Sequence, residues 1–248
     1  MKKLSVIIPA WNEEKIIYKN LKQIGIILGN LLEKIDFDYE IILVNDGSID
    51  NTYDEAMMAA NENIKIKAVT YEKNGGKGYA LKYGFKFCSG ELITFMDVDL
   101  DLHPKQIPQF IDYMKKYDAD IIIGSKRHPL SKINYPGSRK VLSKGYHTLT
   151  RILFHLNLSD TQAGLKLFKY DALEDILPKV LCKKYAFDLE LLVNASHRGY
   201  KIVEAPIELD WQRFETRLTL KDIWRLARDT AAIFYRLNIL RYYDHVRE

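Results

Sequence analysis

Three carboxylates spaced two residues apart follow an apolar run, in the segment FMDVDLD that ends at Asp101. An extended backbone points residues i and i+2 to the same side, so Asp97, Asp99 and Asp101 are predicted to converge on one cation beyond a buried strand. Carboxylate oxygens suit Mg²⁺ or Mn²⁺, and substrate phosphates usually complete the coordination of such ions. The segment therefore predicts a metal site that accepts a diphosphate. The alternative is an acidic turn that caps the helix after Pro104.

An aspartate in a turn and a glycine-rich loop are two further candidate binding groups. Asp46 follows the apolar run 41–44, and its carboxylate can accept a hydrogen bond from a nucleobase N–H. The loop NGGKG over 74–78 enters a predicted helix, so its backbone N–H groups and Lys77 can approach a phosphate or ribose. This loop lacks the spacings of a Walker A motif and of a dinucleotide fingerprint. For Asp46 the alternative is an Asx turn without a ligand.

These motifs follow predicted strands in a chain where strands and helices alternate. Apolar runs rich in β-branched residues predict strands at 4–8, 40–44, 64–69, 92–96, 120–124, 164–168 and 202–209. Helical patterns cover 13–32, with Asn12 as its expected N-cap, then 51–61, 78–88, 104–116, a segment ending near residue 155, and 218–240. The alternation predicts an α/β fold: a Rossmann-like, mostly parallel sheet with helices on both faces and ligands at the carboxyl ends of the strands.

Length and composition are those of an ordinary globular chain. With 248 residues, 47% of them hydrophobic, the chain can form one α/β domain over 1–210 and a C-terminal helical extension over 211–248. Two cysteines are too few for a disulfide framework or a structural zinc site, which favours a reducing cytosol. No run of 18 apolar residues predicts a membrane span. No nucleic-acid partner is expected from a net charge of only +4.

Two basic features point to an anionic partner. Between Ser125 and Tyr170 the single acidic residue is Asp160, and the basic residues are Lys126, Arg127, Lys132, Arg139, Lys140, Lys144, Arg151, Lys166 and Lys169. This asymmetry favours a phosphate-bearing ligand or an anionic membrane surface, with a solvated basic face as the alternative. The predicted helix 218–240 has an apolar face opposite a basic one. It either lies on a membrane surface or packs on its own domain.

Four segments together resemble family 2 glycosyltransferases in their order and in their places at strand ends. They are PAWNE over 9–13, VNDGS over 44–48, NGGKG over 74–78 and DVD over 97–99. The resemblance covers about residues 4–210. Its later part is similar to the branch that makes dolichyl- or polyprenyl-phosphate hexoses, in GSKR over 124–127, DTQAGLK over 160–166 and FDLE over 187–190. It implies a GT-A fold, a UDP- or GDP-hexose donor, a dolichyl or polyprenyl phosphate acceptor, Mg²⁺ or Mn²⁺, and inversion at the anomeric carbon.

The resemblance also implies roles for the donor-side residues. Those expected to contact the nucleoside are Pro9, Trp11, Glu13 and Asp46, with Trp11 standing where Tyr or Phe is usual. Lys77 would lie near the ribose and diphosphate, while Asp97 and Asp99 would serve the diphosphate and the metal. Asp101 departs from the pattern, since relatives often carry Gln there, but a carboxylate would still ligate a hard cation.

The acceptor determines what further chemistry the site needs. A leaving diphosphate must be neutralised, which a metal with Lys or Arg can do. A lipid phosphate is already an anionic nucleophile, and Arg127 or Lys126, with Lys166, can relieve its repulsion from the donor. A hydroxyl acceptor would instead need a general base, for which Asp188 or Glu190 is available.

The expected catalytic group is therefore Asp99, Arg127, Lys166 and Asp188. Trp211 and Arg213 are expected to border the acceptor groove. The predicted enzyme lies in the cytoplasm, peripherally at the inner face of the membrane. Two alternatives remain: a glycosyltransferase acting on a soluble or glycan hydroxyl, and a nucleotide-sugar-binding protein of the same fold without catalysis.

Overall fold

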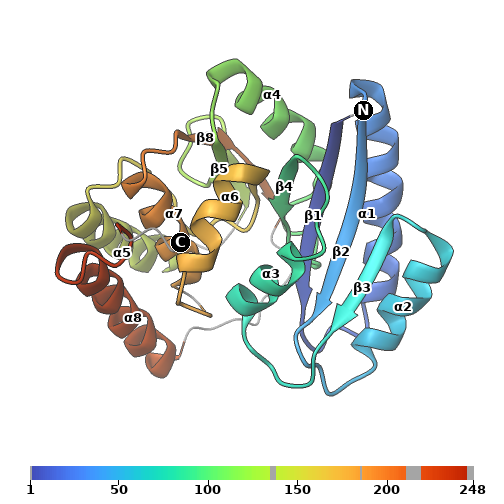
Figure 1. The fold of residues 1–248 in the computed structure, drawn as a ribbon, viewed down its shortest axis with the longest axis horizontal. Helices are drawn as coiled ribbons and strands as arrows, with labels where there is room; N and C mark the ends of the chain where they lie inside the picture. Colours follow the sequence, from blue (N-terminus) through green and yellow to red (C-terminus); the bar gives the residue numbers. More distant parts are fainter. Residues whose placement is uncertain (1, 135–137, 185, 211–218, 245–248) are drawn as a thin grey trace.

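The computed structural model describes residues 2–134, 138–184, 186–210 and 219–244. Its main sheet has seven strands in the order β3-β2-β1-β4-β7-β5-β8 (Figure 1). Their bounds are β1 (Lys2–Ala10), β2 (Phe37–Asn45), β3 (Ile66–Thr70), β4 (Leu92–Phe95), β5 (Ile121–Ser125), β7 (Lys166–Lys169) and β8 (Ile202–Pro206). β7 runs antiparallel to β4 and β5, and the other pairs are parallel. The predicted mostly parallel sheet is confirmed.

Helices cover both faces of this sheet. They are α1 (Ile17–Leu32), α2 (Thr52–Glu62), α3 (Lys77–Phe85), α4 (Ile107–Tyr117), α5 (Ser138–Phe154), α6 (Tyr170–Ile176), α7 (Phe187–His197) and α8 (Leu220–Asn238). Short 3₁₀ turns are η1 (Glu33–Ile35), η2 (Pro104–Gln106) and η3 (Leu177–Lys179). One apolar core joins the sheet to α1, α2 and α4, and a second joins its other face to α3, α6 and α7. Fully buried strands explain why their sequences are continuous apolar runs.

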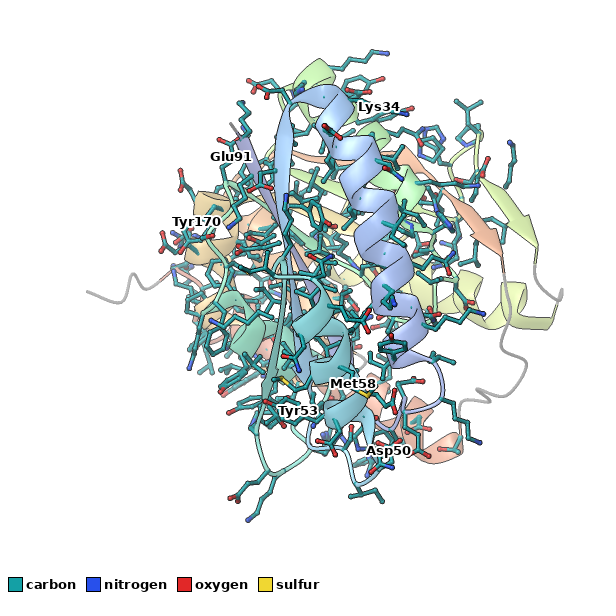
Figure 2. The ribbon with its side chains drawn as sticks, turned by 90° about the vertical axis from the view of Figure 1, so that its right-hand side faces the viewer. Lys34, Asp50, Tyr53, Met58, Glu91 and Tyr170 are labelled. Carbon is teal, nitrogen blue, oxygen red and sulfur yellow. The ribbon has the colours of Figure 1, made fainter. Side chains whose placement is uncertain are left out.

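The strand order reverses at β1, which pairs in parallel with β2 on one side and with β4 on the other. We call the edge of the sheet at the carboxyl ends of β1, β2, β3 and β4 the crevice, after the place where such folds bind ligands. Open α/β sheets bind ligands at such a switch point, beyond the carboxyl ends of the strands. Figure 2 shows Asp50, just after β2, at the lower end of the molecule, and Lys34, just before β2, at the upper end. The predicted motifs therefore all follow strands that end at the lower edge.

Several boundaries differ from the expectation. α1 begins at Ile17, and Asn12 is not its N-cap: Asn12 has φ 56° and accepts a hydrogen bond from Ile49 N, which ties it to the turn after β2. The predicted strand 202–209 is divided, because Pro206 carries no N–H and Ile207 N bonds to Ser131 Oγ. The chain continues as β9 (Glu208–Asp210), which pairs with β6 (Lys132–Asn134) in a separate two-stranded sheet.

The C-terminal helix α8 packs on the domain. Ile233 is fully buried in the second core, and Phe234 lies near Phe154 of α5, with ring centroids 6.4 Å apart. Figure 1 shows α5 and α8 next to each other, away from α1 and α2. The buried face is rotated from the predicted one: the sequence pattern places Trp224 and Phe234 on the apolar face of this helix, but they are 66% and 36% exposed. Among the described residues, no helix is long and apolar enough to cross a membrane.

The contact between α3 and the sheet provides a test of this packing. An added Cβ at Gly84 would lie 2.6 Å from Ile7 Cγ2 and 2.8 Å from Val44 Cγ2. We expect Gly84→Ala to lower the free energy of unfolding by about 1–3 kcal/mol, because both methyl groups belong to packed strands. Gly145→Ala is the matched control, since a Cβ there meets no atom within 4 Å. It should be neutral or stabilising by up to about 1 kcal/mol. Equal unfolding free energies in urea would contradict the described contact.

Candidate active site

The carboxylate of Asp46 holds the glycine-rich loop at the end of β3. Asp46 is 4% exposed. Its Oδ1 accepts hydrogen bonds from Gly75 N at 2.6 Å and Tyr71 OH at 2.7 Å, and its Oδ2 accepts from Gly76 N at 3.0 Å and Asn74 Nδ2 at 3.1 Å. These hydrogen bonds form a long-range contact between two loops rather than an Asx turn at Asp46. Reading of a nucleobase by Asp46 stays a prediction.

The segment after β1 forms the outer rim of the same end. Pro9 pairs with Val44 inside the sheet. Trp11 is 53% exposed, so its indole presents a free apolar face for stacking. Glu13 N donates to Thr52 Oγ1 at 2.7 Å, which fixes the rim to the start of α2. Nucleoside contacts by Pro9, Trp11 and Glu13 stay predictions, and the structure brings their backbone beside the turn that carries Asp46.

Lys77 and Asp97 form an ion pair at the centre of the crevice. Lys77 Nζ lies 2.5 Å from Asp97 Oδ1, with the two side chains 36% and 40% exposed. Loss of water opposes ionisation of both groups. For Lys77 the nearby carboxylates, led by those of Asp97 and Asp188, outweigh this effect and raise its pKa. Likewise, the charges of Lys77 and Lys166 hold the pKa of Asp97 below its ordinary value.

The expected convergence of three carboxylates is wrong in its geometry. β4 ends at Phe95, the chain turns at Val98 and Asp99, and Leu100 adopts φ 64°, so the alternation of an extended strand is lost. Asp99 Oδ1 accepts a hydrogen bond from Asp101 N at 3.2 Å. No three His, Cys, Asp or Glu side chains in the described ranges form a group that could hold a metal. The metal roles of Asp97, Asp99 and Asp101 stay predictions.

A buried ion pair links β7 to α7 beside this acidic turn. Lys166 is 1% exposed, and its Nζ donates to Asp188 Oδ1 at 2.7 Å and to the Ala163 carbonyl at 2.5 Å. Both partners were predicted as catalytic, but their contact joins residues that are 22 positions apart. Next to them, Gly164 leaves room for Asp97, because any Cβ there would collide with the Asp97 carboxylate. The sequence analysis named Gly164 only within a motif and gave it no role.

Part of the basic segment is neutralised by carboxylates in space. Four of its lysines form ion pairs, Lys126 with Asp160 at 2.8 Å, Lys132 with Glu208, Lys166 with Asp188 and Lys169 with Asp120. Arg127 Nη1 donates to the Ser159 carbonyl at 2.7 Å and thus lies beside Asp160 and Lys126. Burial opposes ionisation of Asp160, but Lys126 outweighs it and lowers the pKa of that carboxyl. Lys126 and Arg127 are therefore held in place by these contacts, and their binding of an acceptor phosphate stays a prediction.

Other predicted residues are not at the site or lie outside the described residues. Glu190 has no exposed surface and binds Arg236 Nη2 at 2.8 Å, so its carboxylate is not placed to act as a general base. Trp211 and Arg213 fall in the segment that the structure does not describe. Tyr71 was missed, although an aromatic residue just past a predicted strand and before a glycine-rich loop was a usable signal.

Known proteins similar to this chain are glycosyltransferases. The model for glycosyl transferase family 2 matches residues 5–177. Three curated proteins of Trichomonas vaginalis are each 32% identical to this chain. They are the dolichyl-phosphate beta-glucosyltransferases ALG5C, ALG5D and ALG5A. The alignments cover 94%, 95% and 97% of this chain, and 72%, 75% and 76% of those proteins.

Solved structures give the same fold. Glucosyl-3-phosphoglycerate synthase from Mycobacterium tuberculosis, in complex with Mn²⁺, UDP and phosphoglyceric acid, has a TM-score of 0.69 at 20% identity, covering 94% of this chain and 78% of that chain. The same enzyme with Mn²⁺ and UDP-glucose has a TM-score of 0.65 at 20% identity, with the same coverage. These likenesses confirm the predicted GT-A fold. The family model matches most of this chain, and the curated relatives align with nearly all of it. The chain therefore belongs to glycosyltransferase family 2.

Proposed function

We propose that this protein is a metal-dependent, inverting glucosyltransferase that moves glucose from UDP-glucose to dolichyl or another polyprenyl phosphate at a membrane surface. The observation that carries the proposal is the 32% identity, over 94% of this chain, to a protein named dolichyl-phosphate beta-glucosyltransferase. The sequence alone left open UDP against GDP and glucose against mannose. The name of this relative favours glucose, and the site chemistry below supports a phosphate acceptor.

The donor side has the residues that a divalent ion with a diphosphate requires. Asp97 is partly exposed, its Oδ2 borders the space kept open by Gly164, and both Asp97 and Asp99 act on the pKa of Lys77. Hard cations are commonly held by one or two carboxylates and completed by substrate phosphates, so a site without three converging carboxylates fits Mg²⁺ or Mn²⁺. Asp97 and Asp99 would hold the ion, which would neutralise charge on the leaving diphosphate.

Lys77 is the residue that responds to the donor. Its ammonium is bound to Asp97 in this structure and lies at the start of α3, beside backbone N–H groups. A diphosphate arriving there would offer Lys77 a second anionic partner, since an ammonium can contact several oxygens. The N-terminus of α3 would add its favourable dipole for negative charge. Lys77 thus positions the donor and stabilises the charge that develops on the leaving group.

The acceptor side favours an anionic nucleophile over a hydroxyl. Glu190 is fully buried, and Asp188 is bound to Lys166 at 2.7 Å, so neither carboxylate is presented as a general base. A phosphate oxygen needs no base, because it is already deprotonated at neutral pH. Arg127 and Lys126 would bind this acceptor phosphate. Lys166 would lie close to the reacting groups, because its ion pair with Asp188 fixes its ammonium. Asp188 then serves to hold Lys166.

A surface formed by α5 and α8 supports attachment to a membrane. Exposed apolar side chains on it are Leu149, Ile152, Trp224, Tyr235, Ile239 and Leu240. Arg228 lies over the Trp224 ring at 5.8 Å, so a cation accompanies the largest exposed aromatic residue. Apolar groups flanked by arginines bind the interface of an anionic bilayer. The proposed location is the cytoplasmic face, peripherally bound.

The first test is transfer itself. Purified protein with labelled UDP-glucose, dolichyl phosphate and Mn²⁺ should form a glucose-labelled lipid, and removal of the ion with EDTA should lower the rate by roughly 100-fold or more. Added Mg²⁺ or Mn²⁺ should restore it. Transfer to glycan hydroxyls with no response to lipid phosphate would favour the hydroxyl alternative. Tight UDP binding without transfer or hydrolysis would favour a binding protein.

A second test addresses the acidic turn. We expect Asp99→Asn to lower kcat by roughly 100-fold, because the variant loses a charge that would act on the ion and the diphosphate. The amide oxygen can still accept the hydrogen bond from Asp101 N, so the thermal midpoint should change little. Asp112→Asn, on the exposed face of α4, is the matched control and should keep full activity. Unchanged kcat in Asp99→Asn would remove the metal assignment from this residue.

A third test addresses the membrane surface. Ile239→Ser should reduce flotation with vesicles of phosphatidylcholine and phosphatidylserine severalfold, because it removes an exposed apolar side chain from the proposed contact. Ile64→Ser, at a fully exposed isoleucine before β3, should leave flotation unchanged. Equal flotation of wild type and both variants would show that the α5–α8 surface does not bind lipid.

A further inference from the structure

Glu190 is the centre of a buried polar cluster that the proposed reaction does not use. Its Oε1 accepts hydrogen bonds from Tyr243 OH at 2.6 Å, Arg236 Nη2 at 2.8 Å and Arg236 Nε at 3.0 Å. Its Oε2 accepts from Cys182 N at 2.6 Å and Leu181 N at 2.9 Å. The carboxylate has no exposed surface. A buried charge of this kind is tolerated only when it is fully hydrogen-bonded, as it is here.

The two side-chain donors come from the C-terminal segment. Arg236 lies in α8, and Tyr243, which is 1% exposed, lies in the turn that follows it. Burial, together with the adjacent Glu190 charge, raises the pKa of Tyr243, so its hydroxyl stays a donor at neutral pH. The turn is anchored further by a hydrogen bond between His197 Nε2 and Asp244 Oδ1. The cluster therefore holds the end of the chain against α7.

The two backbone N–H groups that bind Glu190, those of Leu181 and Cys182, belong to a segment that also contacts the glycine-rich loop. Residues 181–184 follow η3, and the Lys183 carbonyl accepts a hydrogen bond from Gly78 N at 2.9 Å. The same carbonyl is so close to Gly76 that a Cβ there would lie 2.6 Å from it. Phe187, at the start of α7, packs against Gly78 in the same way. The glycine-rich loop 74–78 is thus held by Asp46 on one side and by Lys183 on the other.

We propose that Arg236 and Tyr243 are positioning residues, which act through Glu190 and the 181–184 segment to fix loop 74–78, and with it Lys77, for donor binding. The proposal rests on the proposed function in taking this loop as the donor site. It gives the C-terminal segment a part in binding the sugar donor, in addition to the membrane attachment proposed for α8. Neither residue touches the donor, so both act by restricting the loop to one arrangement.

The first test needs no ligand and therefore does not depend on the proposed function. In Tyr243→Phe, which keeps the buried ring and removes one donor to Glu190, amide hydrogen exchange over 75–78 should be several times faster than in wild type. Tyr242→Phe is the matched control: the neighbouring tyrosine is less buried, and its variant should exchange like wild type. Faster exchange confined to 240–244 would show a role limited to the end of the chain and would overturn the proposal.

The second test measures donor affinity by calorimetry with UDP and Mn²⁺, well below the unfolding temperature. Tyr243→Phe should bind UDP about fivefold more weakly than Tyr242→Phe, and KM for UDP-glucose should rise while KM for the acceptor does not. A purely structural role would lower the thermal midpoint and leave these affinities unchanged, which would overturn the proposal. If wild type fails to bind UDP, the donor assignment fails, and hydrogen exchange still decides the coupling.

A third measurement uses wild-type protein alone, in case the variants fold poorly. Coupling is reciprocal, so UDP with Mn²⁺ should slow amide exchange at Leu181 and Cys182, whose N–H groups bind Glu190. Arg236→Lys, which keeps the charge and loses the paired contact, should weaken UDP binding, while Arg225→Lys, at an arginine of the same helix that pairs with Asp222, should not. Unchanged exchange at 181 and 182 on saturation with UDP would overturn the proposal.

Discussion

The glycine-rich loop between β3 and α3 is held from two sides, and the arrangement of the crevice depends on that double contact. Asp46 binds its N–H groups at Gly75 and Gly76, while the Lys183 carbonyl binds Gly78 N. Gly76 has φ 88°, a conformation that costs a residue with a Cβ considerable strain. Because the next residue is Lys77, the loop determines where the ammonium lies relative to Asp97. The glycines allow the close approach, and the two acceptors make it a single arrangement.

Charge is distributed through the crevice by pairing rather than by accumulation. Lys77 is bound to Asp97, Lys166 to Asp188, and Lys126 to Asp160, so these three lysines each have a carboxylate partner. The pair of Lys166 is the most buried of the three on the lysine side, with 1% of that side chain exposed. The consequence for an anionic ligand is that it binds by sharing these cations with their carboxylates. Such preorganised pairs need little rearrangement when negative charge develops nearby.

Much of the fold and of the donor side could be predicted because both follow from local patterns. Apolar runs predicted the strands, and polar residues directly after parallel strands must meet at one edge, which brought Asp46, Lys77 and Asp97 together. The three-carboxylate geometry failed because it assumed that β4 stays extended, whereas Leu100 turns into the left-handed region. The charge asymmetry of residues 125–170 is reduced in space, because four of its lysines form ion pairs. Two of the carboxylate partners, Asp188 and Glu208, come from later parts of the chain.

The C-terminal part could not be derived in this way, since its contacts join distant residues through buried polar groups. Helical periodicity predicted α8 but not its buried face. That face includes Arg236, whose side chain is 15% exposed and is stabilised there by Glu190. No repeat pattern in the sequence encodes such a pair. The family model ends at residue 177, before Lys183, Asp188, Glu190 and Arg236, whereas the curated relatives align over nearly the whole chain. The Asp46 contact and the strands of the main sheet other than β8 therefore lie largely in the part that the family model matches. The second hold on loop 74–78 and the partner of Lys166 come after residue 177, in a part that the alignments with the curated relatives also cover.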